Sequence, residues 1–408
     1  MRIFIGLHEI GNIASTYAKG FRELGHETHS VVVRKNRYYP DSGYDLIVEE
    51  TIGEQQSTPT HFTAIMRILQ GYKIRIAELI RSLKTCDVFI FLFASSFLPG
   101  FIDYPILKLM KKRIVSVFCG SDIRYWYAYN QEFYSLGLGE GFRSRHENAK
   151  IDTTGKDNYF RKLKRVRVAE RYSDLILSQP IMAQLQTRPY MRLNIPIDLS
   201  QYRFKIPARA RPVILHVPTR REIKGTKFIL EAVEKLRSEG ISFDFRLLEN
   251  LSNTEIRKEL TDADLVVDQL LGQTVATLAL EGMASGNVVF ARYLPERLRI
   301  LVECPVVNAT EHTLVEHLRR MVLDVDLRTK TAIAGRAYVE KYHSHLGVVQ
   351  EILEWLNSGG IDAYDFVPTF FQNELKMPKD LLRKERYIIW AQRLRSKARL
   401  ATAFSKKE

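Results

Sequence analysis

Cysteine is scarce in this sequence, and its scarcity excludes two kinds of small, cross-linked structure. The 408 residues include 3 cysteines, Cys86, Cys119 and Cys304, which lie far apart in the chain. That number and spacing are incompatible with a disulfide framework or a Cys-x-x-Cys metal site. We therefore expect thiols that stay reduced, as they do in cytoplasmic proteins.

Long apolar runs are also missing. The longest run, from Val88 to Leu98, contains two serines, and it is about half of the roughly 20 residues that a membrane-spanning helix needs. The segment from Met1 to Asn12 lacks the apolar core of a signal peptide and predicts a first strand instead. We expect no segment that spans a membrane.

Acidic residues are too few to balance the basic ones. Asp and Glu number 47 against 61 for Lys and Arg, which gives a formal net charge of +14. This excess indicates an anionic partner, which the charge alone leaves open between nucleic acid, a phosphorylated metabolite and acidic lipid. With 45% hydrophobic and 26% charged residues, the composition is that of a folded chain. Its length favours more than one domain.

Strand-like and helix-like segments alternate along the chain, which predicts parallel sheets covered by helices on both faces. Apolar residues recur at intervals of three and four between positions 14 and 24, as in a helix that packs on a sheet. The strands expected from the apolar runs are 2–7, 28–33, 87–92, 114–118 and 175–177, then 213–217, 243–248, 265–267 and 288–290 after a proline-flanked break.

This pattern predicts two doubly wound α/β domains, at 1–200 and 201–345. A helix at 346–362 is expected to return to the first domain, and 363–408 to form a basic helical tail. An irregular insertion is expected at about 125–165.

In open α/β sheets, ligands bind beyond the carboxyl ends of the strands, so the turns after strands are the places to search for a site. The first such turn contains Gly11 and Asn12. A glycine there permits close backbone approach, and the N–H groups that begin the next helix can bind an anion. Because a single turn glycine is common, a purely structural role stays open.

The turn after the first strand of the second half is rich in cations. Arg220, Arg221 and Lys224 converge at the start of a helix. Guanidinium groups, an ammonium group and a helix N-terminus together suit a diphosphate. A solvated basic loop is the alternative.

A lone carboxylate is the third unusual feature. Glu281 lies in the otherwise small and apolar helical run 278–286. Burying a carboxylate costs several kcal/mol unless it is paired or hydrogen-bonded, and the vicinal hydroxyls of a sugar are suitable donors. The alternative is that Glu281 forms a helix cap or a local salt bridge.

These segments, in this order, resemble the retaining family 4 glycosyltransferases of the GT-B architecture, in which two Rossmann-like domains face a central cleft. The resemblance covers most of residues 1–358. It is carried by Gly25-His26-Glu27, Arg171-Tyr172-Ser173-Asp174, Asn194-Ile195-Pro196-Ile197-Asp198, Lys224-Gly225-Thr226, the run from Ala263 to Gln269, and the run from Glu281 to Gly286.

The resemblance implies transfer of a sugar, with retention, from a nucleotide-diphosphate-sugar donor to a hydroxyl of a glycan or lipid-linked acceptor. Arg220 and Lys224 would hold the diphosphate, although Arg221 also fits because the spacing to the lysine is shorter than usual. Glu281 matches the second glutamate of the family's E-x7-E motif, which contacts the ribose. The positions assigned to donor binding are Gly11, Asn12, Arg221, Glu249, Gln269 and Glu281.

Two positions depart from the family pattern. Gln273 stands at the first, catalytic glutamate of E-x7-E and lacks its charge. Cys119, which the resemblance places on the acceptor side with Asp122 and Arg124, stands where the family often has histidine, and a thiol is a poor hydrogen-bond donor. The alternative function is therefore a catalytically silent protein that binds a nucleotide-sugar or a glycan.

No metal cofactor is expected. Asp262 and Asp264 form an Asp-x-Asp pair, but Asp264 directly precedes an apolar strand, where aspartate is favoured as a turn residue. His343 and His345 lack acidic or cysteine neighbours in the sequence, and we expect them at the surface.

The basic excess is concentrated in two places. Residues 374–408 contain eleven basic and four acidic residues with Trp390 among them, as in a helix that lies on an anionic membrane. Packing of this helix on the body of the protein is the alternative. The second cluster is expected on a helix of the first domain and comprises Arg161, Lys162, Lys164, Arg165, Arg167 and Arg171.

These clusters predict a cytoplasmic protein on the inner face of the membrane. Nucleic acid is not expected as a partner, because the basic residues lie on scattered elements and match no nucleic-acid-binding module.

Overall fold

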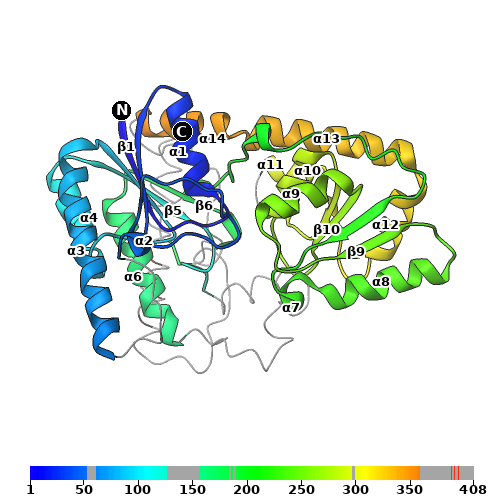
Figure 1. The fold of residues 1–408 in the computed structure, drawn as a ribbon, viewed down its shortest axis with the longest axis horizontal. Coiled ribbons are helices and arrows are strands. Elements are labelled where there is room, and N and C mark those ends of the chain that lie inside the picture. Colours follow the sequence, from blue (N-terminus) through cyan, green and yellow to red (C-terminus); the bar gives the residue numbers. More distant parts are fainter. Residues whose placement is uncertain are drawn as a thin grey trace. The chain divides into compact units, whose positions relative to one another are not determined.

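The structure is a computed structural model, in which the chain forms two compact units (Figure 1). Unit 1 comprises Met1–Asn36, Ser42–Leu193 and Val349–Glu408, and unit 2 comprises Arg37–Asp41 and Asn194–Val348. The residues that the structure describes are 1–52, 61–125, 156–182, 185–186, 190–295, 299–358, 387, 390 and 394. Of the insertion expected at about 125–165, residues 126–155 lie outside the described residues, and residues 156–165 belong to helix α6 (Lys156–Tyr172) instead of an irregular segment. The expected tail, apart from those three positions, also lies outside the described residues.

Unit 1 is built on a sheet of seven parallel strands in the order β3-β2-β1-β4-β5-β6-β7. The strands are β1 (Arg2–Leu7), β2 (Glu27–Val32), β3 (Leu46–Ile47), β4 (Val88–Leu92), β5 (Arg113–Phe118), β6 (Leu175–Ser178) and β7 (Met191–Arg192). In the central strand, Arg2 pairs with Glu27 on one side and Ile3 with Val88 on the other. The strand order reverses between β1 and β4, which is where ligands bind in sheets of this kind.

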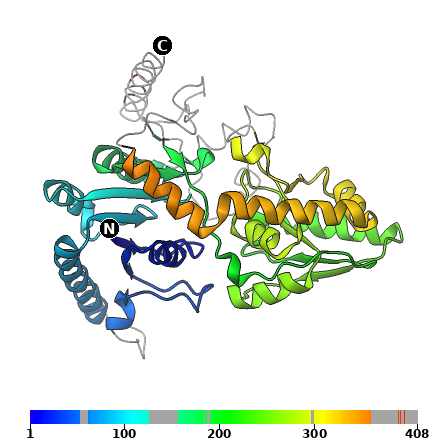
Figure 2. The same cartoon turned by 90° about the horizontal axis from the view of Figure 1, so that it is seen from above.

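Helices cover both faces of this sheet (Figures 1 and 2). They are α1 (Ile13–Glu23), α2 (Val48–Ile52), α3 (His61–Thr85), α4 (Asp103–Leu109), α6 (Lys156–Tyr172) and α14 (His345–Asn357), of which α14 belongs to unit 1 from Val349 on. Because crossovers between parallel strands are right-handed, α1 lies on the face opposite to α3, α4 and α6. On that second face, the rings of Phe4 and Phe97 pack in a tilted arrangement with centroids 4.7 Å apart, beside Leu79 of α3 and Tyr104 of α4.

Unit 2 has a sheet of five parallel strands in the order β12-β11-β10-β8-β9. The strands are β8 (Val213–His216), β9 (Asp244–Leu247), β10 (Leu265–Gln269), β11 (Val288–Ala291) and β12 (Val307–Asn308). The helices are α7 (Arg221–Lys224), α8 (Thr226–Ser238), α9 (Asn253–Asp262), α10 (Thr277–Ser285), α11 (Arg299–Val302), α12 (Leu314–Leu323) and α13 (Val325–His343).

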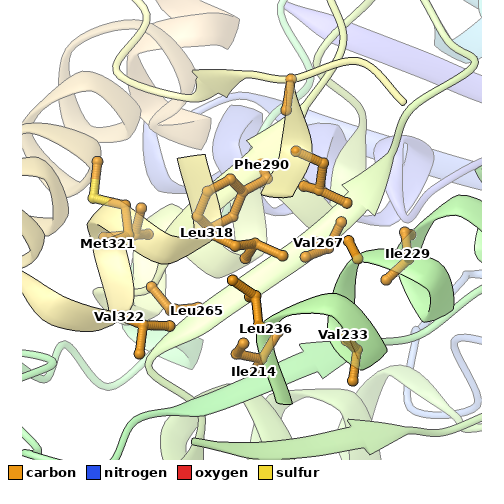
Figure 3. Close-up of a cluster of buried hydrophobic side chains, with 14 of the residues drawn as sticks. Ile214, Ile229, Val233, Leu236, Leu265, Val267, Phe290, Leu318, Met321 and Val322 are labelled. Carbon is orange, nitrogen blue, oxygen red and sulfur yellow. The ribbon is translucent and has the colours of Figure 1, made fainter. Parts of the chain in front are cut away.

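The core of unit 2 lies between this sheet and the helices α8 and α12 (Figure 3). Ile229 and Leu236 of α8 and Leu318 of α12 pack on Leu265 and Val267 of β10, and all five are fully buried. The spacing along each helix matches 3.6 residues per turn, so the apolar side chains meet the sheet on one stripe.

Two glycines permit turns that other residues would strain. Gly225, where α7 ends and α8 begins, has a φ of 77°, and a Cβ there would lie 3.3 Å from Leu270. Gly286 ends α10 with a φ of 89°, and a Cβ there would lie 2.1 Å from the carbonyl oxygen of Lys205. Both turns therefore depend on glycine.

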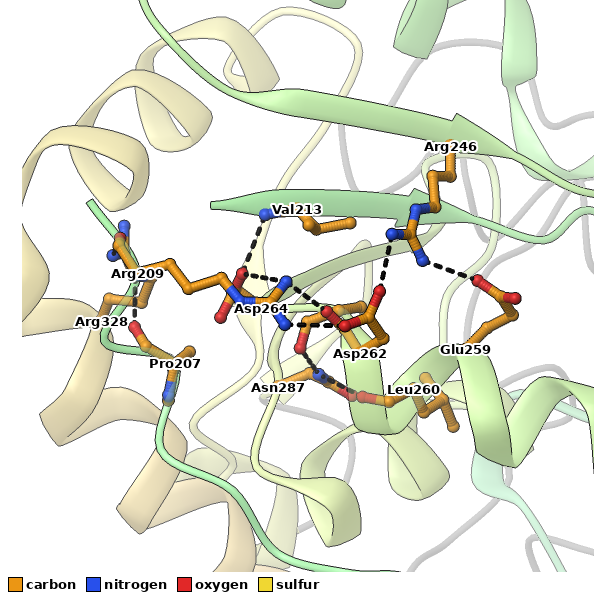
Figure 4. Close-up of polar contacts among 11 residues, drawn as sticks. Pro207, Arg209, Val213, Arg246, Glu259, Leu260, Asp262, Asp264, Asn287 and Arg328 are labelled. Carbon is orange, nitrogen blue, oxygen red and sulfur yellow. Dashed lines mark hydrogen bonds and ion pairs between the residues drawn. The ribbon is translucent and has the colours of Figure 1, made fainter. Parts of the chain in front are cut away.

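Charged side chains join the elements at the amino edge of the unit 2 sheet (Figure 4). Asp264 accepts a hydrogen bond from the backbone N–H of Val213 at 2.9 Å, and Asp262 pairs with Arg209 at 2.7 Å and with Arg246 at 2.6 Å. The Asp-x-Asp pair thus lies at the edge opposite to the one where ligands bind. In the part of the chain that the structure describes, no group of three or more His, Cys, Asp or Glu residues is arranged to hold a metal ion.

His343 and His345 are buried, contrary to the expectation that they lie at the surface. The Nδ1 atom of His343 donates a hydrogen bond to the carbonyl oxygen of Ile195 at 2.9 Å, and the backbone N–H of His345 donates to Ile197 at 3.0 Å. Sequence spacing did not indicate this, because the partners lie about 150 residues earlier in the chain. The three cysteines are free thiols. No helix among the described residues is long and apolar enough to cross a membrane.

Replacing Arg328 with methionine is expected to destabilise unit 2. Arg328 is fully buried and donates hydrogen bonds to four carbonyl oxygens, those of Pro207, Arg209, Met321 and Val322. The methionine variant leaves these acceptors buried without donors, which costs about 3 kcal/mol or more, and lowers the melting temperature by roughly 5–10 °C.

Calorimetric thermal unfolding measures this effect. The control is Arg320→Met, at an exposed position of α12, which should change the melting temperature little. Equal melting temperatures for the Arg328 and Arg320 variants would contradict the structural role assigned to Arg328.

Candidate functional site

The carboxyl end of β8 is organised by a buried histidine. His216 is fully buried, with Nδ1 2.6 Å from the carbonyl oxygen of Val267 and Nε2 2.9 Å from the hydroxyl of Thr226. A carbonyl oxygen only accepts, so Nδ1 carries the proton and Nε2 accepts from Thr226. Burial lowers the pKa of His216 to about 4, which keeps the ring neutral. The neutral ring fixes the start of α8 against β10. It thereby also positions the preceding cationic turn, which contains Arg220, Arg221 and Lys224.

Lys224, at the end of α7, forms a buried ion pair with Asp268 of β10. Its Nζ atom lies 2.5 Å from Oδ1 of Asp268, and the two side chains are 13% and 0% exposed. The backbone strengthens this junction, because the N–H of Leu270 donates to the carbonyl oxygen of Lys224 at 3.1 Å. The other oxygen of Asp268, Oδ2, is buried without a hydrogen-bond partner among the described residues. The ion pair holds the Lys224 ammonium at the edge of the sheet where ligands bind.

The loop that follows β10 is shaped by Gln269. Its Nε2 atom donates to the carbonyl oxygen of Thr274 at 2.6 Å, and a Cβ at Gly272 would lie 2.6 Å from its side chain. Gln269, which the resemblance assigned to donor binding, therefore supports the loop from inside. In the same loop, Gln273 is 1% exposed, and neither atom of its side-chain amide has a hydrogen-bond partner among the described residues. Buried amides are almost always paired, so Gln273 has capacity for a ligand.

Helix α10 begins at this loop with an open N-terminus. Its N-cap residue, Ala276, makes no side-chain capping hydrogen bond, and the first turn contains no acidic residue. The first N–H groups of such a helix carry partial positive charge and attract anions. The open N-terminus and the Lys224 ammonium both border residues 270–276.

Glu281 is buried within α10 and hydrogen-bonded to neutral donors from other elements. Its Oε1 atom accepts from the hydroxyl of Tyr202 at 2.9 Å and from Nδ2 of Asn253 at 2.7 Å. Burial raises the pKa of the Glu281 carboxyl to about 7, and the two hydrogen bonds oppose that shift. Among the described residues the carboxylate forms no salt bridge and no helix cap, which were the expected alternatives to sugar binding.

The remaining cations of this turn differ in their partners. Arg221 forms two hydrogen bonds with Glu249, at 2.9 and 2.5 Å, and the side chains are 52% and 35% exposed. Arg221 follows β8 and Glu249 follows β9, so two of the residues assigned to donor binding pair with each other. Arg220 is exposed, and its side chain forms no hydrogen bond or ion pair within the described ranges.

In unit 1, the turn after β1 contains its own anion. The Glu9 carboxylate is buried and accepts hydrogen bonds from the N–H groups of Ala14 and Ser15, at 3.3 and 3.1 Å, and from the hydroxyl of Tyr44 at 2.7 Å. Burial raises the pKa of Glu9, whereas these hydrogen bonds lower it. The N-terminus of α1, expected to be open to an external anion, is occupied by Glu9.

Gly11 and Asn12 lie in the same turn, with φ angles of 60° and 63°. The carbonyl oxygen of the Asn12 side chain accepts from the hydroxyl of Ser42 at 2.5 Å. Both residues therefore shape the entry into α1. Their assignment to donor binding stays a prediction.

The expected acceptor-side residues lie together in the turn after β5. The buried Asp122 carboxylate accepts from the N–H groups of Cys119 and Gly120, at 3.2 and 2.7 Å, and holds the turn closed. Burial raises the pKa of the Cys119 thiol well above its usual range, so the thiol stays protonated. The Nε atom of Arg124 lies 3.0 Å from the sulfur of Met182.

Part of the basic cluster on α6 faces inward rather than toward solvent. Lys162 donates to the carbonyl oxygen of Arg124 at 2.5 Å, Arg165 to that of Asp122 at 2.9 Å, and Arg167 to that of Leu185 at 2.9 Å. These three cations stabilise neighbouring loops, which weakens the argument that this cluster binds a membrane.

His8 lies at the carboxyl end of β1 and was not singled out from the sequence. Its ring meets that of Phe93 edge-on, with centroids 5.7 Å apart. The His8 side chain is exposed, but partial desolvation and the cations Arg165 and Arg75 lower its pKa, so the imidazole is neutral near pH 7. Its position directly after the first strand was the only sequence signal that could have found it.

A cavity of about 600 Å³ opens in unit 1 beside the carboxyl end of β2. Its wall includes Arg34, which forms hydrogen bonds of 2.9 and 2.8 Å with Glu49. Helix α3 supplies Tyr72 and Arg75, and the Arg75 guanidinium stacks on Tyr72 at 4.5 Å. The cavity thus combines apolar walls with paired charges, as clefts for polar organic ligands do.

No protein-family model matches the chain, and no curated protein matches it in sequence. Solved structures match its fold. HepE from Anabaena, in complex with UDP-glucose, superposes with a TM-score of 0.53 at 11% identity, over 88% of this chain and 99% of HepE.

WaaG, a glycosyltransferase involved in lipopolysaccharide biosynthesis, gives a TM-score of 0.52 at 11% identity, over 88% of this chain and 100% of WaaG. An α-glucosyltransferase in complex with UDP and a DNA 13-mer gives 0.52 at 13% identity, over 87% and 98%. WaaG is involved in lipopolysaccharide biosynthesis, whereas the α-glucosyltransferase was solved with DNA, so the fold alone does not indicate an acceptor. The chain has the GT-B fold, as its sequence predicted.

The variant Glu281→Gln is expected to gain stability over the wild type as the pH rises. Between pH 4.5 and 7 the unfolded wild type has released the Glu281 proton while the folded protein still holds it, so wild-type stability falls across this window. Glutamine does not titrate. The difference in unfolding free energy should therefore grow by on the order of 3 kcal/mol between pH 4.5 and 8.

Urea unfolding at several pH values measures this difference. The matched control is Glu316→Gln, at an exposed position of α12, for which the difference should stay constant. A constant difference for Glu281→Gln as well would contradict the burial of an ionisable carboxyl at this position.

Proposed function

We propose that the protein is a glycosyltransferase that moves a sugar from a nucleotide-diphosphate-sugar to a hydroxyl acceptor. Unit 2 binds the donor in this proposal. The observation that carries it is the combination of the Lys224 ammonium, the open N-terminus of α10 and the unpartnered amide of Gln273 at one edge of one sheet. Cationic groups suit the diphosphate, and a buried amide suits sugar hydroxyls.

The chemical contribution of unit 2 is positive charge that is already in place when the bond to the diphosphate breaks. Asp268 holds Lys224 in position, and the α10 N–H groups are fixed by the helix. Such preorganised charge stabilises a developing anion without a cost of reorganisation. Arg220 adds a cation that its own neighbours do not use. In this proposal these groups neutralise the leaving diphosphate, and no metal ion is needed.

Gln273 and Glu281 are proposed to bind the sugar and the ribose of the donor. The Gln273 amide offers both a donor and an acceptor, so it can bind a hydroxyl in either sense. Glu281 already receives two hydrogen bonds on Oε1, which leaves Oε2 for a ribose hydroxyl. At position 273 this chain has an amide where the family has a carboxylate. The proposed retaining transfer does not need a carboxylate there, because the acceptor attacks the sugar on the same face that the diphosphate leaves.

Unit 1 is proposed to bind the acceptor. The Glu9 carboxylate already occupies the N-terminus of α1. This end of the helix is therefore better suited to a neutral hydroxyl compound than to an anionic ligand. The neutral imidazole of His8 and the 600 Å³ cavity beside β2 support this assignment. A glycan or lipid-linked acceptor of a cytoplasmic polysaccharide pathway fits these features.

A screen of UDP-, GDP-, ADP- and dTDP-sugars by thermal unfolding tests donor binding. CMP-sugars, which contain a single phosphate, serve as the matched control. Stabilisation by a diphosphate donor, followed by its slow hydrolysis without an acceptor, is the expected result. Stabilisation without turnover on any donor and acceptor would instead favour a silent binding protein.

Replacing Lys224 with alanine is expected to lower sugar transfer, or donor hydrolysis, by about a hundredfold or more. Because this change also leaves Asp268 buried and unpaired, the double variant Lys224→Met with Asp268→Asn should recover stability but not activity. The control is Lys227→Ala, three residues further on, whose side chain is 81% exposed. Turnover near the wild-type rate in the Lys224 variants would exclude the proposed role.

A further inference from the structure

Unit 2 includes a short segment from the first part of the chain. Unit 1 is interrupted after Asn36 and resumes at Ser42, and the residues between them, in the loop that joins β2 to β3, belong to unit 2. We define the strap as these residues, Arg37–Asp41. It packs on the N-terminus of α9, although Asp41 and its partner Thr254 are 213 residues apart in the sequence. The strap is therefore a tertiary contact that local sequence patterns do not reveal.

The strap binds α9 at the end where a helix has free donors. The first N–H groups of a helix have no acceptor within it, and the backbone N–H of Asn253 donates to the carbonyl oxygen of Tyr38 at 2.7 Å. The Asp41 carboxylate accepts a hydrogen bond from the hydroxyl of Thr254 and lies 3.9 Å from the Arg257 guanidinium. A carboxylate is favoured at this end by the partial positive charge of the helix. The strap thus has both a backbone anchor and a side-chain anchor on α9.

Asn253 joins the strap to Glu281. Its backbone N–H binds the strap, and its side-chain Nδ2 atom donates to Oε1 of Glu281 at 2.7 Å. The residue is 5% exposed, so water competes little for these bonds. The hydroxyl of Tyr202 donates to the same oxygen, and no donor among the described residues bonds Oε2. The two donors therefore fix the carboxylate and leave Oε2 as the oxygen that can meet a ligand.

We propose that Asn253, held by the strap, positions Glu281 for the ribose of the donor. The proposal rests on the proposed function, in which Oε2 of Glu281 accepts a hydrogen bond from a ribose hydroxyl. A side chain that contacts a ligand is held in its productive orientation by the hydrogen bonds of its neighbours. Asn253 is such a neighbour, and the carbonyl oxygen of Tyr38 holds it in turn. A segment far from the donor-binding motifs thereby contributes to donor affinity.

The variant Asn253→Ala tests the positioning role. It retains the backbone N–H that binds the strap and removes the hydrogen bond to Glu281. Dissociation constants are measured calorimetrically for UDP-, GDP-, ADP- and dTDP-glucose. A donor that the wild type binds should bind the variant about tenfold more weakly, because a hydrogen bond to a charged group is lost. Donor hydrolysis at saturation should change little, because the ribose is remote from the bond that breaks. The matched control is Lys258→Ala, at an exposed position of the same helix.

Two further readouts distinguish positioning from a merely structural role. The hydrogen bond from Asn253 lowers the pKa of Glu281, as Arg257 also does, whereas Asp268 raises it. A carboxylate is a stronger acceptor than a carboxylic acid, so donor affinity should fall as the pH falls through this pKa. In Asn253→Ala that fall should begin at a higher pH. In the background of Glu281→Gln, Asn253→Ala should have no further effect on affinity.

The strap itself is tested through its side-chain anchor. The double variant Asp41→Ala with Thr254→Val removes the bond between these side chains. Hydrogen exchange should become faster in peptides that cover residues 250–260. Donor affinity should fall by at least about fivefold, as expected for two coupled elements. Glu316→Ala, at an exposed position of α12, is the control and should leave both quantities unchanged.

Three results would overturn the proposal, and each has a separate meaning. Equal donor affinity in the wild type, Asn253→Ala and the strap variant would show that the strap serves packing alone, even if the variants unfold at lower temperature. An equal loss of affinity on Asn253→Ala with and without Glu281→Gln would mean that Asn253 does not act through Glu281. If the wild type binds none of the four donors, the proposed function fails and this proposal fails with it.

Discussion

The buried pair of Lys224 and Asp268 is the interaction on which the candidate site depends. Burying an ammonium group that is 13% exposed is costly without a compensating charge, and β10 supplies the carboxylate of Asp268 at 2.5 Å. The pair also joins the two loops of the site, because the residues that follow Asp268 lead to Gln273 and α10. His216 supports the same junction from the other side of the turn, as a neutral ring between Val267 and Thr226. Side-chain and backbone bonds therefore tie the cationic turn to the edge of the sheet.

The two units treat equivalent helix ends differently. In unit 1 the first N–H groups of α1 are bonded to the Glu9 carboxylate, and in unit 2 the N-terminus of α10 has no side-chain cap. Both helices follow the carboxyl end of a parallel strand, so the difference lies in the side chains and not in the fold. At the N-terminus of α1 a carboxylate of the protein itself accepts the free N–H groups. No such carboxylate caps α10, so its first N–H groups can bind an external anion. This contrast supports the proposal that unit 2, rather than unit 1, binds the anionic part of the donor.

The sequence was sufficient for the fold, whereas the roles assigned to the site residues stay predictions. Apolar strands such as 213–217 and 265–267 are buried on both faces, and this produces the continuous runs that predicted β8 and β10. Lys224 was predicted because it lies in a cationic turn directly after a strand, and Gln273 because it stands at the first glutamate of the E-x7-E motif. Glu9 was not, since its role depends on a hydroxyl from Tyr44, 35 residues away. Gln269 and Arg221 were assigned to the ligand, although both have partners within the protein. Local patterns record which strand a residue follows, but not which side chain it meets across the sheet.

For the proposed function, the compensation of Lys224 by Asp268 also has a consequence for how an anionic ligand would reach the site. Arg221 is compensated in the same way by Glu249, so Arg220 is left as the main uncompensated cation of the turn. Long-range attraction depends on net charge and weakens as salt is added. Because the carboxylates largely cancel the positive charges of this turn, the turn attracts a distant phosphate group only weakly. It interacts strongly with a phosphate group only at contact distance. The strong positive charge of the chain as a whole and the selectivity of this turn are thus separate properties, which arise in different parts of the molecule.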